Sequence, residues 1–172
     1  MNDQAKSDQQ PNTEQPKPTG RDWFLQQLVT MANESGGGAF GVTLCVKGIT
    51  ISGVIASGRD YFAGFAQNVT AAIERDDPHT DAPTRQKIQD YFTRFGEIYP
   101  TSRHDSDDKP IDDANADAAD QDDDDAKPLP EFVHLRNARI FNGQTFIPTN
   151  YGVWWRGRIA EVDGWFLGTL GR

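Results

Sequence analysis

The sequence predicts an α+β fold: a small, curved antiparallel sheet of about five strands, with two or three helices covering one side. Two strand-rich segments with turn signals, at 41–57 and 131–168, alternate with amphipathic helical segments. These strands are too few to be stable as separate sheets, so we expect them to complete one sheet. The pattern leaves open whether that sheet is open or closes into a barrel of SH3-like or Sm-like size.

The first helix is expected over residues 22–33, with Thr19 or Asp22 as its N-cap. Large apolar residues recur there at helical spacing and form the expected buried face: Trp23, Phe24, Leu28 and Met31, widened by Leu25 and Val29. The glycines at 36–38 end the helix and supply a hinge, because glycine adopts the left-handed backbone of a helix exit.

Residues 41–57 predict an antiparallel hairpin with Lys47-Gly48 as its two-residue turn. With this turn Val46 opposes Ile49, and the apolar alternation agrees on both strands, as a half-buried sheet requires. The face expected toward the core consists of Val42, Leu44, Val46, Ile49, Ile51 and Ile55.

Two further helices are expected over 58–75 and 84–95. Their apolar residues are spaced by three and four: Tyr61, Phe62, Phe65, Val69 and Ile73 in one, and Ile88, Tyr91, Phe92 and Phe95 in the other. Gly64 interrupts the first of these helices, Asp76-Asp77-Pro78 ends it, and Pro100 closes the second.

The C-terminal part predicts a strand over 132–141 and a second hairpin over 153–168, with Asp163-Gly164 as its turn. The 132–141 strand is expected to pair with one of the two hairpins. Alternation along the hairpin's first strand separates two faces: Val153, Trp155 and Ile159 toward the core, and Trp154, Arg156 and Arg158 outward.

Composition divides the chain into one domain, over 21–100 and 131–172, and two segments expected to be disordered, 1–20 and 101–130. Residues 105–125 hold eleven Asp and one Lys, so this tract accounts for the whole net charge of −9 and leaves the remainder near +1. A single cysteine, Cys45, excludes an internal disulfide, and no secretory signal or membrane span is evident. We therefore expect a cytoplasmic protein.

No catalytic, nucleotide-binding or metal-binding motif is found, so neither an enzyme nor a cofactor is expected. The aspartate tract lacks the order of an EF-hand, and the three histidines are far apart. A weak alternative is a hydrolase in which His134 forms an acid–base pair with Glu161 or Asp163.

The expected partner-binding residues are Trp154, Arg156 and Arg158, because Trp and Arg are enriched at interaction hot spots. The simpler interpretation is that the arginine stems merely cover the tryptophan. A second, salt-sensitive contact is expected from the acidic run Asp122, Asp123, Asp124 and Asp125, whose simpler interpretation is a self-repelling linker.

The blocks HLRNARI at 134–140 and WRGRIAEVDGWFLG at 155–168 resemble the gas vesicle accessory protein U family, as do ISGVI at 51–55 and Tyr61-Phe62. The resemblance covers roughly 100 residues. It implies a non-enzymatic protein acting in gas vesicle assembly or clustering, with the shell protein or other accessory proteins as partners, and leaves self-association open. The alternative is an RNA-binding module on an Sm-like barrel, which the near-neutral charge outside the tract disfavours.

Overall fold

The computed structural model describes residues 20–35, 40–99 and 128–170, and shows the expected α+β class with six strands. The helices are α1 (Trp23–Glu34), α2 (Gly58–Asp76) and α3 (Ala82–Thr93). The strands are β1 (Gly41–Val46), β2 (Ile49–Ala56), β3 (Phe132–Phe141), β4 (Phe146–Ile147), β5 (Val153–Arg158) and β6 (Val162–Leu167). Two 3₁₀ turns are η1 (Arg94–Gly96) and η3 (Ile159–Glu161). The segments expected to be disordered and the 36–38 hinge fall largely or wholly outside the described residues.

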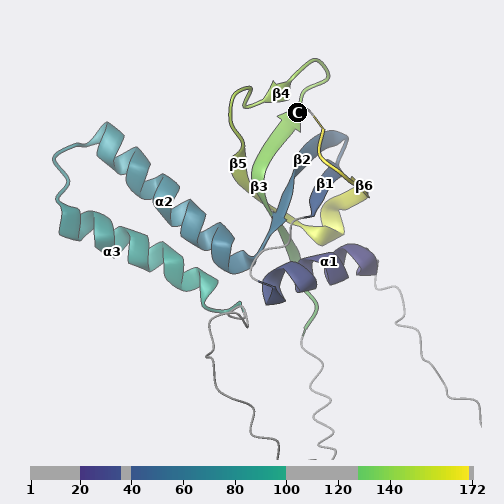
Figure 1. Cartoon of the computed structure of the whole chain (residues 1–172), viewed down its shortest axis with the longest axis horizontal. Helices are drawn as coiled ribbons and strands as arrows, with labels where there is room; N and C mark the ends of the chain where they lie inside the picture. Colours follow the sequence, from purple (N-terminus) through teal and green to yellow (C-terminus); the bar gives the residue numbers. More distant parts are fainter. Residues whose placement is uncertain (1–19, 36–39, 100–127, 171–172) are drawn as a thin grey trace, which may run out of the picture.

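All strands lie in one antiparallel sheet with the order β4-β3-β2-β1-β6, and β5 also pairs with β3 (Figure 1). The first hairpin is confirmed in its turn and register, because Val46 pairs with Ile49 and Leu44 with Ile51. The prediction that 132–141 joins a hairpin is also confirmed, since β3 pairs with β2. The short strand β4 was not predicted; it extends the edge of β3.

The predicted hairpin about Asp163-Gly164 is wrong. β5 pairs with β3 and β6 pairs with β1, so the two strands lie at opposite edges of the sheet. Gly164 lies within β6 opposite Cys45 and does not have a positive φ. The Asp163 carboxylate accepts a hydrogen bond from the Lys47 backbone N–H at 2.6 Å, and so stabilises the neighbouring turn. The local preference of Asp-Gly for a turn is outweighed here by strand pairing. The free edges of β3 and β1 supply backbone hydrogen-bond partners along β5 and β6, respectively.

The sheet is strongly curved. Only the three residues of η3 separate the end of β5 from the start of β6, so the chain itself brings the two edges of the sheet together at this point. The Ile159 side chain is 1% exposed and anchors this turn in the core. Within the described residues β5 and β6 do not pair, so the sheet is open rather than a closed barrel.

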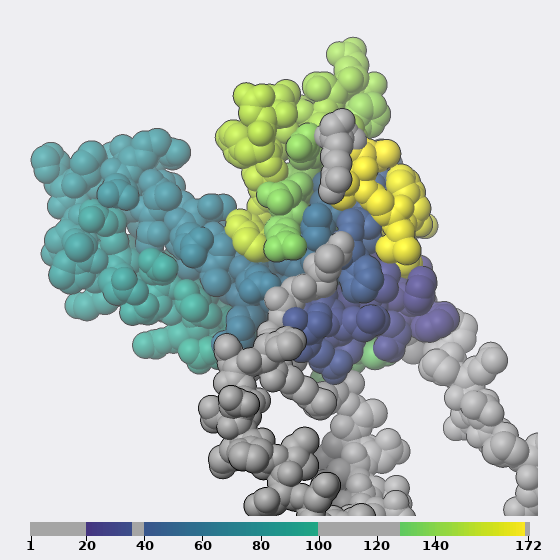
Figure 2. All heavy atoms as spheres, in the orientation of Figure 1, coloured from purple at the N-terminus to yellow at the C-terminus, as the bar shows by residue number. Residues whose placement is uncertain are grey.

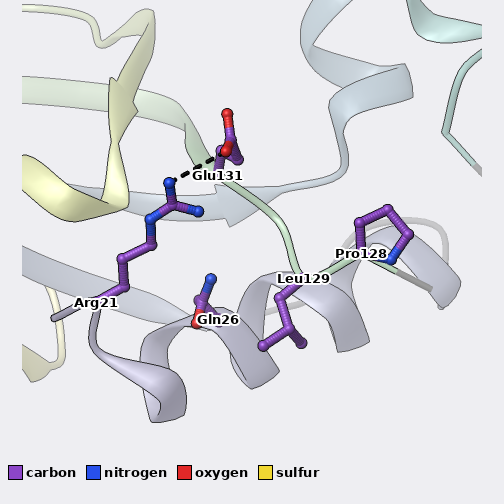
Figure 3. Close-up of a pocket in the computed structure, with 5 residues that line it drawn as sticks. All are labelled: Arg21, Gln26, Pro128, Leu129 and Glu131. Atoms are coloured by element: carbon purple, nitrogen blue, oxygen red, sulfur yellow. Dashed lines mark hydrogen bonds and ion pairs between the residues drawn. The ribbon is translucent and has the colours of Figure 1, made fainter. Parts of the chain in front are cut away.

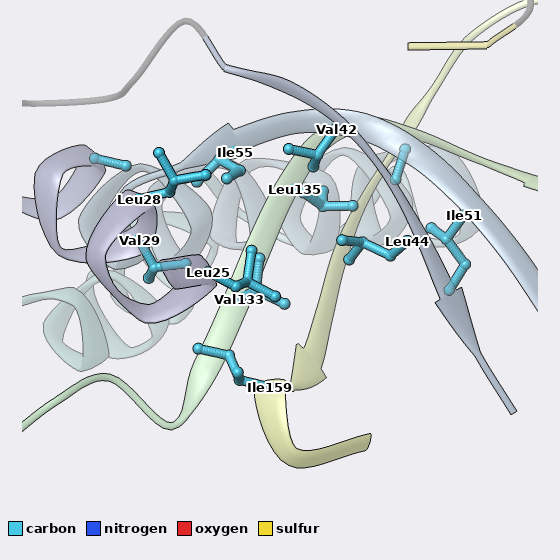
Figure 4. Packing of buried hydrophobic residues seen from close by; sticks show 12 residues of the cluster. Leu25, Leu28, Val29, Val42, Leu44, Ile51, Ile55, Val133, Leu135 and Ile159 are labelled. Carbon is cyan, nitrogen blue, oxygen red and sulfur yellow. The ribbon is translucent and has the colours of Figure 1, made fainter. Parts of the chain in front are cut away.

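The core lies between the concave face of the sheet and α1 (Figure 4). The cluster comprises Leu25, Leu28, Val29, Ala32, Val42, Leu44, Ile51, Ile55, Val133, Leu135, Ala138 and Ile159. The expected face of α1 is partly wrong, because Trp23, Phe24 and Met31 are about half exposed whereas Leu25 and Val29 are fully buried. Ile49 is also exposed, since it adjoins the Lys47-Gly48 turn. Asp22 is the N-cap of α1 and accepts from the Leu25 N–H at 2.9 Å.

The helices α2 and α3 form an antiparallel arm that projects from the side of the sheet (Figures 1 and 2). Helix α2 ends where predicted but passes through Gly64 without interruption. Helix α3 begins at Ala82, earlier than expected, because Asp81 caps it and accepts from the Thr84 N–H at 2.7 Å. None of its residues is fully buried, so the expected buried face of α3 remains partly open.

Candidate functional site

The outer face of β3 and β5 carries the sequence-predicted site. Alternation along β5 places Trp154, Arg156 and Arg158 on this face. Val153 and Trp155 pack against the core on the opposite face, which confirms the predicted separation. Cross-strand pairing sets Arg156 directly beside His134 of β3. The site therefore has two layers: aromatic rings and a histidine beneath, and arginines above.

Trp154 does not point freely into solvent. Its indole lies against the backbone of α2 at Gly64, where a Cβ atom would come within 2.1 Å of the ring. Tyr61 contacts the same indole edge-on, with ring centroids 6.1 Å apart. Trp154 therefore joins the helical arm to the sheet, and only part of it is accessible.

His134 is completely buried between the sheet and the arm. Its ring lies 4.7 Å from that of Tyr61, 5.6 Å from that of Tyr99 and 6.2 Å from that of Phe62. Neither ring nitrogen has a hydrogen-bond partner among the described residues. Burial, and secondarily the Arg156 charge, lowers the pKa of His134 to about 3, so this histidine is neutral at physiological pH.

Arg156 covers this aromatic group. Its guanidinium carbon lies 3.7 Å from the centre of the Phe132 ring and 5.7 Å from that of Phe62. A cation over an aromatic face is held by the ring quadrupole, which restricts the side chain while leaving its outer edge exposed. Burial raises the pKa of Tyr61 and of Tyr99, and the Arg156 charge opposes the rise in both.

The acid–base pair considered for His134 is not formed. Glu161 makes an ion pair with Lys47, which lowers the pKa of Glu161 and raises that of Lys47. Asp163 is bound to the Lys47 backbone. Across the described ranges no group of His, Cys, Asp and Glu side chains is arranged to hold a metal ion. Both carboxylates are therefore engaged at Lys47, and neither is paired with His134.

The family model described as "Gas vesicle protein GvpU-like" matches residues 22–170. The chain belongs to this GvpU-like family. No curated protein and no solved structure gives a significant match. Membership relates the chain to gas vesicles and confirms the resemblance noted in its sequence.

The acidic residues Asp122, Asp123, Asp124 and Asp125 of this GvpU-like chain lie outside the described residues, although within the matched range. Their role as a contact segment stays a prediction. No helix in the described part of the chain is long and apolar enough to cross a membrane.

Sequence reasoning missed the packing role of three glycines in this GvpU-like fold. Each lies directly against an aromatic ring. A Cβ atom on Gly58 would overlap the Tyr99 ring, one on Gly64 the Trp154 ring, and one on Gly157 the Trp155 ring. Gly64 and Gly157 lie inside a helix and a strand, where glycine is unfavourable, and Gly58 is the first residue of α2. Glycine at such positions was a visible signal in the sequence. The ring that each glycine contacts was not, because that ring is either distant in the chain or reaches the glycine only through its side-chain conformation.

A hollow beside α1 is lined by Arg21, Gln26, Pro128, Leu129 and Glu131 (Figure 3). Arg21 pairs with Glu131 at 3.1 Å, and the Gln26 amide donates to the Pro130 carbonyl at 3.0 Å. These contacts fasten the chain entering β3 to α1, and Gln26 Oε1 has no partner among the described residues. The hollow includes Pro128, the residue at which the described part of the chain begins again, so it is not assigned a ligand.

Proposed function

We propose that this protein is a non-enzymatic accessory protein that acts in gas vesicle assembly or clustering through protein–protein contacts. Its partners are the shell protein or other accessory proteins, and its site of action is the cytoplasmic surface of the vesicle. Family membership supports the pathway. The observation that carries the contact itself is the arginine–aromatic surface formed by Trp154, Arg156 and Arg158 above His134.

Several features of this surface favour partner binding. Arg156 is already positioned over Phe132, so less side-chain entropy is lost when a partner binds it. Arg158 is exposed, and alternation along β3 places the exposed Arg136 on the same face. Exposed arginine beside partly buried tryptophan is the composition of an interaction hot spot.

The charge of this surface comes from arginine alone. His134 is neutral above a pH of about 3 and arginine stays protonated, so binding of an acidic partner surface is independent of pH in the physiological range. The aspartate tract supplies charge of the opposite sign in the same chain. We propose that it is a second contact mode, directed at basic partner surfaces.

Flotation of the purified full-length protein with buoyant gas vesicles tests the proposal. We expect association at low salt that weakens at high salt, because exposed charges are screened. An Arg156→Gln, Arg158→Gln double variant is expected to lose about tenfold or more in affinity. The matched control is Lys87→Gln, Arg94→Gln, which removes two exposed cations of the arm. Equal flotation of both variants, or no flotation at any salt, would contradict the proposal.

The alternative of an RNA-binding module is separated by a filter-binding assay on the same proteins. Phosphate contacts need a basic surface, and the chain outside the tract is close to neutral. RNA affinity that disappears in Arg156→Glu would favour this alternative over a vesicle contact.

A further inference from the structure

Strand β6 is a free edge of the sheet. It pairs with β1, and no other described strand lies against it. The Gly168 N–H donates to the Gly41 carbonyl at 2.7 Å, which identifies a hydrogen-bonded pair at this position. Hydrogen-bonded pairs alternate along an antiparallel ladder, so Phe166 faces β1 with its backbone groups. Trp165 and Leu167 consequently direct their N–H and C=O groups away from the sheet.

This edge is apolar and lacks the usual protection. Phe166 is 52% exposed and Leu167 is 58% exposed. Free edges are ordinarily guarded by lysine, proline or an inward-pointing charge. The one charged residue of β6 is Asp163, which lies near the start of the strand and is bound to Lys47.

We propose that β6 pairs antiparallel with β6 of a second copy of this chain, about a twofold axis through Phe166. In this register Trp165 of each copy opposes Leu167 of the other, and both present the outward backbone groups that the ladder needs. Phe166 opposes its own counterpart as a non-hydrogen-bonded aromatic pair, in which side chains approach most closely. A twofold contact requires such self-complementarity.

Charge selects this register over its neighbour. Moving the axis to Trp165 would set Leu167 opposite Asp163 of the second copy and remove the pair of phenylalanines. With the axis at Phe166, Asp163 lies beyond the end of the second copy's β6, and no charged side chain of one β6 faces a charged side chain of the other. The alternation also joins like faces, so the core-side residues Trp165 and Leu167 meet on one side of the continued sheet.

The exposed area agrees with a reversible dimer. Phe166 and Leu167 are about half exposed, as is Phe24, which packs on Trp165 with ring centroids 5.6 Å apart. Three such side chains offer about 300 Å² per copy. Stable interfaces bury roughly 800 Å² per partner. Pairing through one strand therefore predicts a dissociation constant in the micromolar range rather than an obligate dimer.

The biological role of the dimer rests on the proposed function. A dimer presents two copies of the arginine–aromatic surface, so one dimer links two vesicle surfaces. Once the first surface is bound, the second binds with a high effective concentration. The pairing itself does not depend on vesicles, which allows the two proposals to fail separately.

Analytical ultracentrifugation of the full chain tests the pairing. We expect a concentration-dependent monomer–dimer equilibrium, with dimer at about 100 μM. Phe166→Lys sets two like charges together on the axis and is expected to weaken dimerisation by about tenfold or more. Ile147→Lys, at a 50% exposed position on the opposite edge, is the control and is expected to leave it unchanged. Mixing Phe166→Lys with Phe166→Glu is expected to restore dimers as the mixed pair.

Cysteine cross-linking in a Cys45→Ser background provides a readout that does not depend on stability. Phe166→Cys is expected to form a disulfide-linked dimer on mild oxidation, because Cα atoms of a non-hydrogen-bonded pair lie about 4.5 Å apart, within disulfide range. Ile147→Cys should not. A monomer at every concentration, or a Phe166→Lys dimer as tight as the parent, would overturn the proposal. Retained dimers without vesicle flotation would instead reject the proposed function alone.

Discussion

Gly64 decides how closely the helical arm approaches the sheet. Glycine costs a helix interior about 1 kcal/mol relative to alanine, so its presence in α2 needs a compensating contact. That contact is the Trp154 indole, which occupies the space a Cβ atom would need. The need for glycine at position 64 thus comes from a residue 90 positions away in the chain. This explains why the sequence suggested only an interruption of the helix.

Gly64→Ala should therefore lower the free energy of unfolding by about 1–3 kcal/mol, despite the better helix propensity of alanine. Urea denaturation measures the change. In a Trp154→Ala background the same substitution is expected to be neutral or stabilising by up to about 1 kcal/mol, because the overlapping ring is gone. A loss of equal size in both backgrounds would show that the ring is not the cause.

His134 gives the fold a specific dependence on pH. Its ordinary pKa of 6.5 applies in the unfolded chain and falls to about 3 in the folded one. Between these values the unfolded state binds the proton and the native state does not, so stability is lost as pH falls from about 6.5 toward 3, by up to about 1.4 kcal/mol per pH unit. We expect His134→Phe to flatten this part of the stability curve, measured by denaturant unfolding at several pH values. His79→Phe, at an exposed position, should leave the curve unchanged.

At the scale of elements, what the sequence predicted well was local. The Lys47-Gly48 hairpin, the Asp22 cap and the 132–141 strand each depend on residues close in sequence. The separation of faces along β5 was predictable for the same reason. The pairing of β6 with β1 was not predictable, because it depends on which strand edges remain unpaired after the rest of the sheet has formed. The covering of Trp154 by α2 is likewise a tertiary contact that periodicity does not reveal.

Gly164 distinguishes the strand from the predicted turn. A Cβ atom there meets nothing within 4 Å and the residue does not have a positive φ, so Gly164→Ala should change the free energy of unfolding by less than about 0.5 kcal/mol. Gly48, the true turn glycine, has φ +81°, and Gly48→Ala should cost about 1 kcal/mol or more. Thermal or urea unfolding of the two variants provides the comparison. The reverse order of stabilities would favour a turn at Asp163-Gly164.

At the scale of the whole molecule, charge is divided between a nearly neutral folded part and a strongly acidic tract. Composition alone predicted this division, because it needs no knowledge of the fold. Under the proposed function, this division implies that long-range attraction to vesicles and stability of the fold respond to different residues.

Replacing Asp122, Asp123, Asp124 and Asp125 by asparagine should therefore weaken low-salt flotation with vesicles and leave the unfolding midpoint unchanged. The physical reason is the loss of four charges from a tract whose composition predicts disorder, where charges act on a partner but support no core. Flotation across a salt series, with thermal unfolding of the same samples, measures both. Unchanged flotation at low salt would remove the tract from the contact.

The pairing of Ala56 with His134 also affects how the chain tolerates change in length. The chain leaves the sheet after Ala56 and returns through β3 beside the same point, so the arm and the tract form one insertion whose ends the ladder holds together. Lengthening a closed loop costs entropy only logarithmically, about 0.6 kcal/mol per doubling. We therefore expect a longer tract, a shorter one or a reporter domain inserted within residues 101–127, whose composition predicts disorder, to leave the core undisturbed.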